Sequence, residues 1–473
     1  MKSSSARRAA LLLAALPPIL IIGLVARYGV DLPHWDQFEM VPLFQALADG
    51  RLGWHQLWAP HNEHRLLLPK AIMLGMGHLT RWNLWWELAL NIILALGALG
   101  IFGQLLLRDL RMDDAQQPAG WRAWAALPIA SMLIFSPLQW ENWIWGWQIQ
   151  IFLAALLTFA TVAILARDDG GSWRRLGAAA STTLAAGCSF GSSLFLWPAA
   201  LPLVVAGPRD VSNGRRLARG VIWCVVAVVF GMVYLQDIAR DSPPIEDPVA
   251  ATKLVVSYVA IYLGKAIIGF YGWQSLHGGV GLAACTAILA FLRLDQAWRS
   301  AHRNAWLRAA LPYATFLAFA TLVALATASG RAHLGLEQAL SSRYNTLANF
   351  FWLGALGLWT VKPPTPAPEP WIARARLAIR CAALATFLAI FINANRLAPR
   401  ILHDQHQGRI EIRQNLQASI DVDSDALAFL FPHEALVRQH LAWLEAERYS
   451  LFRSSDPRPT DPNGTAAGGE EER

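Results

Sequence analysis

Apolar segments of about 16 to 20 residues recur along most of the chain, and no other feature of the sequence constrains the fold as strongly. A helix of roughly 20 residues spans the hydrocarbon core of a bilayer, where every backbone N–H and C=O group must find a partner within the protein. Charged residues make up only 15% of the chain, whereas soluble domains carry about 25%. The sequence therefore predicts an all-α polytopic membrane protein.

The charge of the connecting segments predicts how the chain is oriented. Positive residues concentrate on the cytoplasmic side of membrane proteins. The arginine-rich connections of this chain are 107–122, 167–175, 208–219, 293–308 and 362–376. The connections between them are rich in tryptophan, histidine, asparagine and carboxylates, so we expect these on the outer face. The N-terminus is then cytoplasmic and the C-terminus outside, as in a multi-pass protein of the bacterial inner membrane.

This orientation predicts about eleven transmembrane spans in one bundle. Only one crossing fits between Arg65 and the inner loop at 107, so Leu66–Thr80 becomes an outer juxtamembrane helix. By the same argument, Leu254–Gly272 is a partial or surface helix on the outer side. The tight pair within 175–207 is either two spans or a hairpin that does not cross fully. The predicted spans are 9–27, 84–107, 123–137, 149–166, 175–189, 192–207, 219–236, 278–293, 309–327, 346–361 and 376–394.

Three parts of the chain differ in composition. Residues 1–395 form the predicted transmembrane domain, with its longest outer loop at 28–83, and residues 396–453 form an outer helical appendage. The Pro, Gly, Asp and Glu mixture of 454–473 predicts disorder. The N-terminus has the basic start and apolar core of a signal sequence but no small-x-small cleavage site, so we expect an uncleaved first span. The net charge of +7 comes from arginines spread over short loops, which does not indicate nucleic-acid binding.

Ionisable and aromatic residues gather on the predicted outer side. The stretch DLPHWDQFEM at 31–40 follows the first span directly. Asp36 and Glu39 lie three residues apart there, so a helix presents both on one face. The other candidates for contact with a substrate, a phosphate or a metal are His61, Glu63, His64, Arg65, Glu141, Lys265, Arg331, His333, Arg343 and Tyr344, with Trp35 and Trp143 among the tryptophans.

These residue types suit one kind of substrate. Carboxylates act as general bases or as ligands of a divalent metal. Arginine and lysine at an interface bind phosphate, and aromatic faces pack against a sugar ring or a lipid edge. We therefore predict a site for a phosphate-bearing lipid that approaches from the outer leaflet. Other interpretations stay open: Asp36 as a helix N-cap, Glu39 paired with Arg51 or Arg65, the tryptophans as an interfacial belt, and the arginines as lipid anchors.

The first outer loop resembles that of the GT-C superfamily of membrane glycosyltransferases, which includes the protein O-mannosyltransferases and the aminoarabinose transferase of lipid A. The acidic motif of that family corresponds here to HWDQF at 34–38. A His-Pro-Pro-Leu-like element corresponds to HNEHRL at 61–66, where both prolines are absent. The segments FSPLQWENWIWGWQIQ and GRAHLGLEQALSSRYN also look like those of a group of uncharacterised bacterial multi-span proteins.

The resemblance implies an inverting transfer of a sugar from a polyprenyl-phosphate donor to a glycan, lipid or protein acceptor. Asp36 would be the general base, with Glu39 as a second acidic residue. Arg331, Arg343 or Lys265 would stabilise the leaving lipid phosphate, alone or with a divalent metal held by Glu141 or Glu63. No nucleotide-binding motif occurs in the sequence, which agrees with a donor already activated as a phosphate.

Three alternatives remain at this point. A transporter or flippase of a lipid-linked sugar would carry polar residues at the middle of the membrane and internal repeats, and the sequence has no clear repeat. A polysaccharide ligase would use a lipid-diphosphate donor and outer-loop arginines instead of an acidic base. A scaffold for envelope assembly would need no concave polar site.

Overall fold

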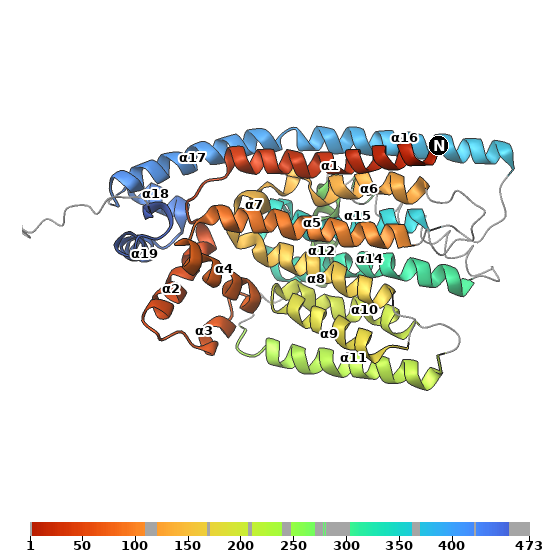
Figure 1. The fold of residues 1–473 in the computed structure, drawn as a ribbon, viewed down its shortest axis with the longest axis horizontal. Helices are drawn as coiled ribbons and strands as arrows, with labels where there is room; N and C mark the ends of the chain where they lie inside the picture. Colours follow the sequence, from red (N-terminus) through yellow and green to blue (C-terminus); the bar gives the residue numbers. More distant parts are fainter. Residues whose placement is uncertain are drawn as a thin grey trace, which may run out of the picture.

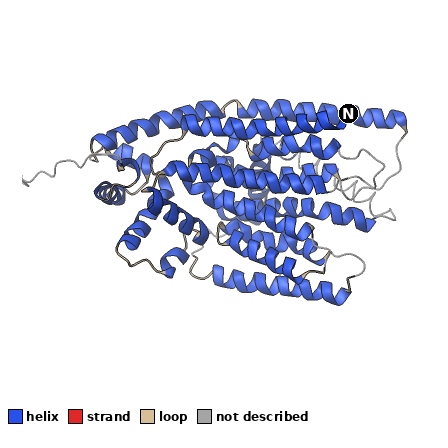
Figure 2. Cartoon of the chain, viewed as in Figure 1, coloured by secondary structure: helices blue, strands red, loops and turns tan. Residues whose placement is uncertain are grey.

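The computed structural model describes residues 2–108, 121–167, 171–206, 211–238, 247–269, 303–361, 369–420 and 422–453, together with positions 278 and 280. Within these residues, all regular secondary structure is helical (Figure 2), apart from one isolated bridge between His61 and His64. The predicted loops at 107–122, 293–308 and 362–376 fall largely outside these residues. The predicted span 278–293 and the predicted disordered tail 454–473 also lie outside them, except for the two single positions.

Most helices run along the long axis of the molecule and form one bundle (Figure 1). The bundle helices are α1 (Lys2–Tyr28), α5 (Leu84–Arg108), α6 (Trp121–Ile134), α8 (Ile149–Ala166), α9 (Trp173–Gly187), α10 (Leu196–Val205), α11 (Asn213–Tyr234), α12 (Pro248–Ile268), α14 (Arg303–Arg331), α15 (Asn345–Thr360) and α16 (Pro370–Asn395). Among the described residues, eight helical segments are long and apolar enough to cross a membrane. This supports an all-α polytopic protein.

The eleven expected spans are supported only in part among the described residues, and the predicted span 278–293 lies almost entirely outside them. Three predicted spans correspond to helices of 15, 10 and 16 residues, namely α9, α10 and α15. These helices are shorter than the roughly 20 residues that cross a bilayer unaided. Helix α10 is preceded by the short helix η5 (Gly191–Phe195), and together they form an apolar segment over Gly191–Val205.

Helix α12 is longer than the partial helix predicted from the loop charges. It has 21 residues and is apolar enough to count among the eight possible spans. Its C-terminal half lies against the connection between α14 and α15: the Tyr262 ring stacks on Tyr344 with 5.2 Å between centroids, and the Lys265 ammonium donates to the Ser341 carbonyl. This half of α12 therefore stays at the end of the bundle where that connection lies.

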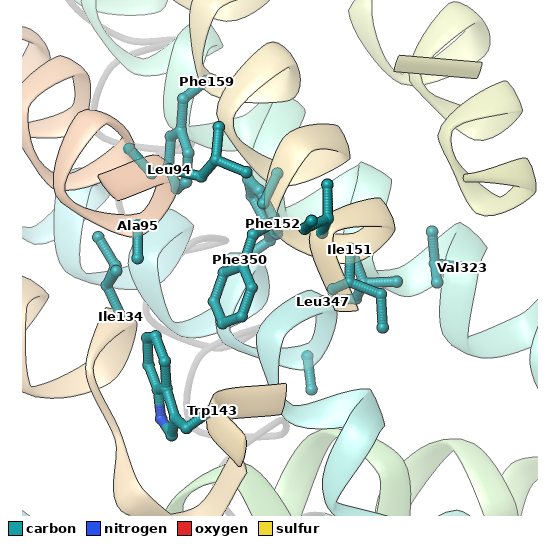
Figure 3. Close-up of a cluster of buried hydrophobic side chains, with 14 of the residues drawn as sticks. Leu94, Ala95, Ile134, Trp143, Ile151, Phe152, Phe159, Val323, Leu347 and Phe350 are labelled. Carbon is teal, nitrogen blue, oxygen red and sulfur yellow. The ribbon is translucent and has the colours of Figure 1, made fainter. Parts of the chain in front are cut away.

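An aromatic cluster fills the middle of the bundle. Phe159 of α8 stacks on Phe350 of α15 at 4.6 Å and meets Phe316 of α14 at 5.1 Å (Figure 3). Such pairs contribute about 0.5–1.5 kcal/mol each beyond their buried area. Helices α14 and α15 approach closely because α15 carries a glycine at the contact: a Cβ on Gly357 would stand 1.9 Å from the Tyr313 ring. Small residues at helix crossings have this role in membranes.

The connections collect at the two ends of the bundle. One end, on the left in Figure 1, carries a layer of short helices, and the N-terminus lies at the other end. The short helices of this layer are η1 (Trp35–Met40), α2 (Val41–Ala48), α3 (Trp54–Trp58), α4 (Leu67–Thr80), η3 (Pro137–Gln139), α7 (Trp140–Ile144), η4 (Gly146–Gln148), η6 (Ala332–Leu334), η7 (Leu336–Leu340), η8 (Ser342–Tyr344), α18 (Ser424–Leu430), α19 (Glu434–Ala446) and η9 (Ser450–Phe452). Helix α17 (Ala398–Ala418) follows α16 into the same layer.

The C-terminal helices contact the connection between α1 and α5. The Arg453 guanidinium pairs with the buried carboxylate of Asp31, and the Ser450 backbone N–H donates to the Arg81 carbonyl at 2.8 Å. The Phe429 ring of α18 lies 5.3 Å from the His34 ring. The C-terminal helices and the connection that follows α1 are therefore in contact within one layer.

Candidate functional site

The acidic motif forms the short helix η1, and an internal hydrogen bond shapes its start. The His34 backbone N–H donates to the Gln37 side-chain oxygen at 3.2 Å, which is the capping geometry of a helix N-terminus. Asp36 lies in the first turn with its side chain 23% exposed, and its carboxylate is 3.5 Å from His61 Nε2. Among the described residues, no lysine or arginine lies within 4.0 Å of this carboxylate.

A buried carboxylate that the sequence analysis did not select holds η1 in place. Glu87 of α5 is 1% exposed and accepts a hydrogen bond from Gln37 Nε2 at 2.8 Å and another from Trp82 Nε1 at 2.9 Å. Gly146 packs directly over this carboxylate, since a Cβ there would stand 2.0 Å from Glu87 Oε2. Glu87 is therefore a positioning residue for the turn that carries Asp36.

The predicted group at 61–65 forms a tight turn. His61 and His64 exchange backbone hydrogen bonds of 2.7 and 2.9 Å, which turns Glu63 outward to a 3.2 Å ion pair with Arg331 of α14. Arg331 also donates to the Tyr344 hydroxyl at 3.3 Å. The turn thus joins the connection between α1 and α5 to the connection between α14 and α15.

Two ionisable side chains of this turn have shifted pKa values. Burial lowers the pKa of His64 to about 4, and Glu63 only partly offsets this effect. Burial raises the pKa of Glu63, but the nearby Arg331 guanidinium and a backbone hydrogen bond outweigh it, so the pKa lies below its ordinary value. At neutral pH the turn therefore carries a neutral His64 beside an ionised Glu63.

Arg65 is a structural residue, and its prediction as a phosphate ligand is corrected. Its guanidinium donates to the carbonyls of Tyr234 at 2.7 Å, Trp58 at 2.8 Å and Gln236, and it stacks over the Trp58 ring. It is 2% exposed. Two of these acceptors, Tyr234 and Gln236, lie at the C-terminal end of α11, where carbonyls lack helical partners. Arg65 therefore caps α11, and three of its five guanidinium N–H groups are used by backbone carbonyls.

Asparagines join the connection between α6 and α8 to the segment 341–346. Asn142 donates to the Arg343 carbonyl at 3.1 Å and to Thr346 Oγ1 at 2.8 Å, while Asn345 donates to the Leu138 carbonyl at 2.8 Å. Glu141 accepts a hydrogen bond from the Ser342 hydroxyl. The two connections are 201 residues apart in sequence at this contact, yet they form one surface.

Three cationic side chains surround this surface. Lys265 is 1% exposed and lies 5.5 Å over the Tyr344 ring, and Arg343 lies 5.7 Å over the Trp145 ring. Arg409 of α17, which the sequence analysis did not select, is 3% exposed and donates to the Ile144 carbonyl at 2.9 Å. Within the described chain, no carboxylate lies within 4.0 Å of any of the three, although the charge of Glu141 acts on Lys265 and Arg409. The three cations outnumber this carboxylate, so the cluster can attract a further anion.

His34 shows the effect of this positive potential. Its pKa lies well below the ordinary value, chiefly because the side chain is buried and further because Arg409 and Arg343 are close. Its backbone carbonyl accepts a 3.0 Å hydrogen bond from Trp145 Nε1. His34 is thus a neutral residue that links the acidic turn to the cationic cluster.

In the segment 140–148, the tryptophans that contact the candidate site are Trp145 and Trp147, whereas the predicted Trp143 lies in the core. Trp143, predicted as a sugar or interface aromatic, lies in the core between Phe135 and Phe152 and is 1% exposed (Figure 3). Trp145 contacts His34, and the Trp147 ring lies 5.2 Å from His61. The spacing of the tryptophans gave no signal for this choice, because the chain leaves α-helical geometry at 145.

Three other candidates lie apart from these contacts or at their margin. Glu39 is exposed, and its charge acts on Lys70 of α4. His333 is exposed and has no hydrogen bond or ion pair to another described residue. Trp35 lies beside His34, is 42% exposed and has a backbone φ of 49°, so it faces outward from the turn.

The acidic and histidine side chains do not form a metal centre. In the described ranges, no three His, Cys, Asp or Glu side chains come together closely enough to hold a metal ion. The two carboxylates predicted as metal ligands have other partners, since Glu141 accepts from Ser342 and Glu63 pairs with Arg331. In the described structure these two carboxylates are engaged by protein partners, and a divalent metal stays a prediction.

Comparisons of the chain with protein-family models, with curated proteins and with solved structures return no match. The likeness to the GT-C superfamily therefore rests on the motif residues and the order of the spans, and membership stays a prediction. The geometry itself gives a carboxylate–histidine pair and a cationic cluster, joined by His34, Trp145 and the 61–64 turn at one end of the bundle.

Proposed function

We propose that this protein is an integral-membrane glycosyltransferase that moves a sugar from a polyprenyl-phosphate donor to an acceptor hydroxyl at this end of the bundle. The observation that supports the proposal most is the pairing of a partly exposed carboxylate, Asp36, with a separate cationic cluster in the same layer. An acid–base group and an anion site are what such a transfer needs.

In this mechanism Asp36 accepts the proton of the acceptor hydroxyl as its oxygen attacks the anomeric carbon. The bond between that carbon and the phosphate oxygen breaks, and the electron pair leaves with the lipid phosphate. The configuration at the anomeric carbon inverts in a single displacement. Asp36 suits this role because its side chain is partly exposed and no Lys or Arg among the described residues lies within 4.0 Å of its carboxylate.

The cationic residues bind the leaving group. Lys265, Arg343 and Arg331 would each donate to phosphate oxygens, as arginine and lysine do in phosphate sites. Lys265 and Arg331 reach Tyr344 from different helices, so the tyrosine holds both near one place. Arg343 lies on the side of His34 and therefore nearer the acidic turn.

The test measures transfer of labelled sugar from polyprenyl-phosphate donors in membranes that contain the protein. We expect Asp36→Asn to reduce transfer by about 10²–10⁴-fold, the usual contribution of a general base. The matched control is Glu39→Gln, which removes an exposed carboxylate from the same short helix and should leave transfer within about twofold. Full transfer by Asp36→Asn at normal expression would refute the role of Asp36.

The same assay separates the alternatives. A polysaccharide ligase would accept only polyprenyl-diphosphate donors, and its activity would depend on Arg331 and Arg343 but not on Asp36. A flippase would move the donor between leaflets without forming a new glycosidic bond. Transfer from the monophosphate donor that depends on Asp36 distinguishes the proposed activity from both.

A further inference from the structure

A groove opens at the end of the bundle opposite the candidate site. It follows α8 between α5 and α9, and α8 packs against both of these helices (Figure 1). The groove encloses about 580 Å³. Its lining comes from one face of each helix, since the residues recur at helical spacing. They are Ile101, Gln104, Ala160, Ala163, Ile164, Arg167, Arg174, Arg175 and Ala178.

The lining changes from apolar to cationic along the axis of the bundle. On α8 the groove runs from Ala160 past Ile164 to Arg167, which is the residue that ends the helix. The helix rises about 10 Å from Ala160 to Arg167. Arginines and Gln104 therefore line the outer end of the groove, while alanine and isoleucine line the part nearer the middle of the bundle.

Two arginines at the outer end of the groove lack a carboxylate partner among the described residues. The Arg167 guanidinium donates to the Gln104 side-chain oxygen, and the Arg175 guanidinium donates to the Arg167 carbonyl. The Gln104 acceptor is neutral, so it orients the Arg167 guanidinium without cancelling its charge. No described carboxylate lies within 4.0 Å of Arg167 or Arg174. These two guanidinium groups can therefore attract an anion to the outer end of the groove.

We propose that this groove binds an anionic glycerophospholipid, with the phosphate at Arg167 and Arg174 and an acyl chain along Ile164 and Ala160. A free phosphate ion would use the arginines but not the apolar wall. Two of the helices that line the groove, α5 and α8, are long and apolar enough to cross a membrane, and the groove is exposed at Gln104 and Ala178. Arginine clusters between membrane helices bind lipid phosphates in this way.

The experiment measures how much phosphatidylglycerol the purified protein retains, with phosphatidylcholine as the uncharged comparison, by native mass spectrometry after exchange into detergent. The test variants are Arg167→Gln with Arg174→Gln, which removes the charge, and Ala178→Trp, which fills the groove and keeps the charge. The control is Arg215→Gln with Arg216→Gln, an equal charge change at the same end outside the groove lining.

We expect both test variants to retain at least tenfold less phosphatidylglycerol than the wild type and the control pair. Equal loss in the control pair would mean that general surface charge holds the lipid, and the proposal would fail. Undiminished retention in Ala178→Trp would also overturn it, because the chain would then lie elsewhere. Competition by inorganic phosphate at concentrations comparable to the lipid would show a free-anion site instead. Equal melting temperatures of the variants exclude loss of folding as the cause.

Discussion

The contact between Glu87 and η1 gives the sharpest test of how the fold positions the candidate base. Both carboxylate oxygens of Glu87 are used, one by Trp82 Nε1 at 2.9 Å and the other by Gln37 Nε2 at 2.8 Å. In Glu87→Gln the side chain keeps its shape, but its single carbonyl oxygen can satisfy only one of these donors. The other donor then faces an amide NH₂ group in a buried position.

The cost follows from this count. A buried donor without an acceptor destabilises a protein by about 1–3 kcal/mol, so we expect Glu87→Gln to lower the free energy of unfolding by that amount. The change also loosens Gln37, whose side-chain oxygen receives the His34 N–H one residue before Trp35. We expect labelled-sugar transfer to fall at least tenfold, because small displacements of a catalytic group cost rate steeply.

A double-mutant cycle with Trp82→Phe makes the argument specific. Removing the indole N–H leaves only Gln37 to be satisfied, so Glu87→Gln should cost much less in the Trp82→Phe background than in the wild type. Stability is measured by denaturant titration in detergent micelles, and transfer is measured in membranes. Strictly additive losses, or a fully stable and active Glu87→Gln protein, would refute the reasoning.

Three further outcomes follow from the site. Gly146→Ala places a Cβ 2.0 Å from Glu87 Oε2, so we expect it to reduce transfer as Glu87→Gln does, measured in the same assay. Arg65→Met leaves carbonyls at the end of α11 without donors, and we expect a loss of about 2–4 kcal/mol, seen as a lower melting temperature that Arg65→Lys does not restore. His64 has a pKa of about 4, below its ordinary value, so the unfolded chain binds the extra proton first on acidification. Stability should therefore fall from about pH 6.5 to pH 4, and His64→Gln should flatten that part of the pH profile of the melting temperature.

The sequence predicts the long helices well because hydropathy reports directly on burial in lipid. Helix α5 begins and ends within one residue of the predicted span 84–107, and helix α1 ends one residue after the predicted span 9–27 but begins at Lys2. Hydropathy does not tell whether a short helix packed among other helices crosses the membrane, and three predicted spans correspond to such short helices. It also does not reveal where along the bundle a helix such as α12 lies.

The site could be predicted by type of residue but not by partner. Loop composition points to the end that holds Asp36, Glu63, Glu141 and Arg343. These residues have partners in the same layer: Glu63 pairs with Arg331, Glu141 accepts from Ser342, and Arg343 lies over the Trp145 ring. It does not separate Arg343, which lacks a carboxylate partner among the described residues, from Arg65, whose donors are used by backbone carbonyls. That distinction depends on where α11 ends, 169 residues further along the chain.

Glu87 and Arg409 were missed for the same reason. Each lies within an apolar or helical segment whose pattern gives no sign of function, and the partner that reveals it is distant. Gln37 lies 50 residues from Glu87, and Ile144 lies 265 residues from Arg409. A charged residue within an apolar helix is the weak signal that could have selected Glu87, whereas α17 carries several other charged residues around Arg409.

The attachment of the C-terminal helices to the connection between α1 and α5 has a consequence for biogenesis. The acidic turn is translated before most of the bundle, but Arg409, Phe429 and Arg453, which lie close to His34 or Asp31, are translated after the bundle helices. During synthesis these contacts are absent while the intervening helices are made. This layer is therefore completed only when α17 and the helices that follow it dock against the turn.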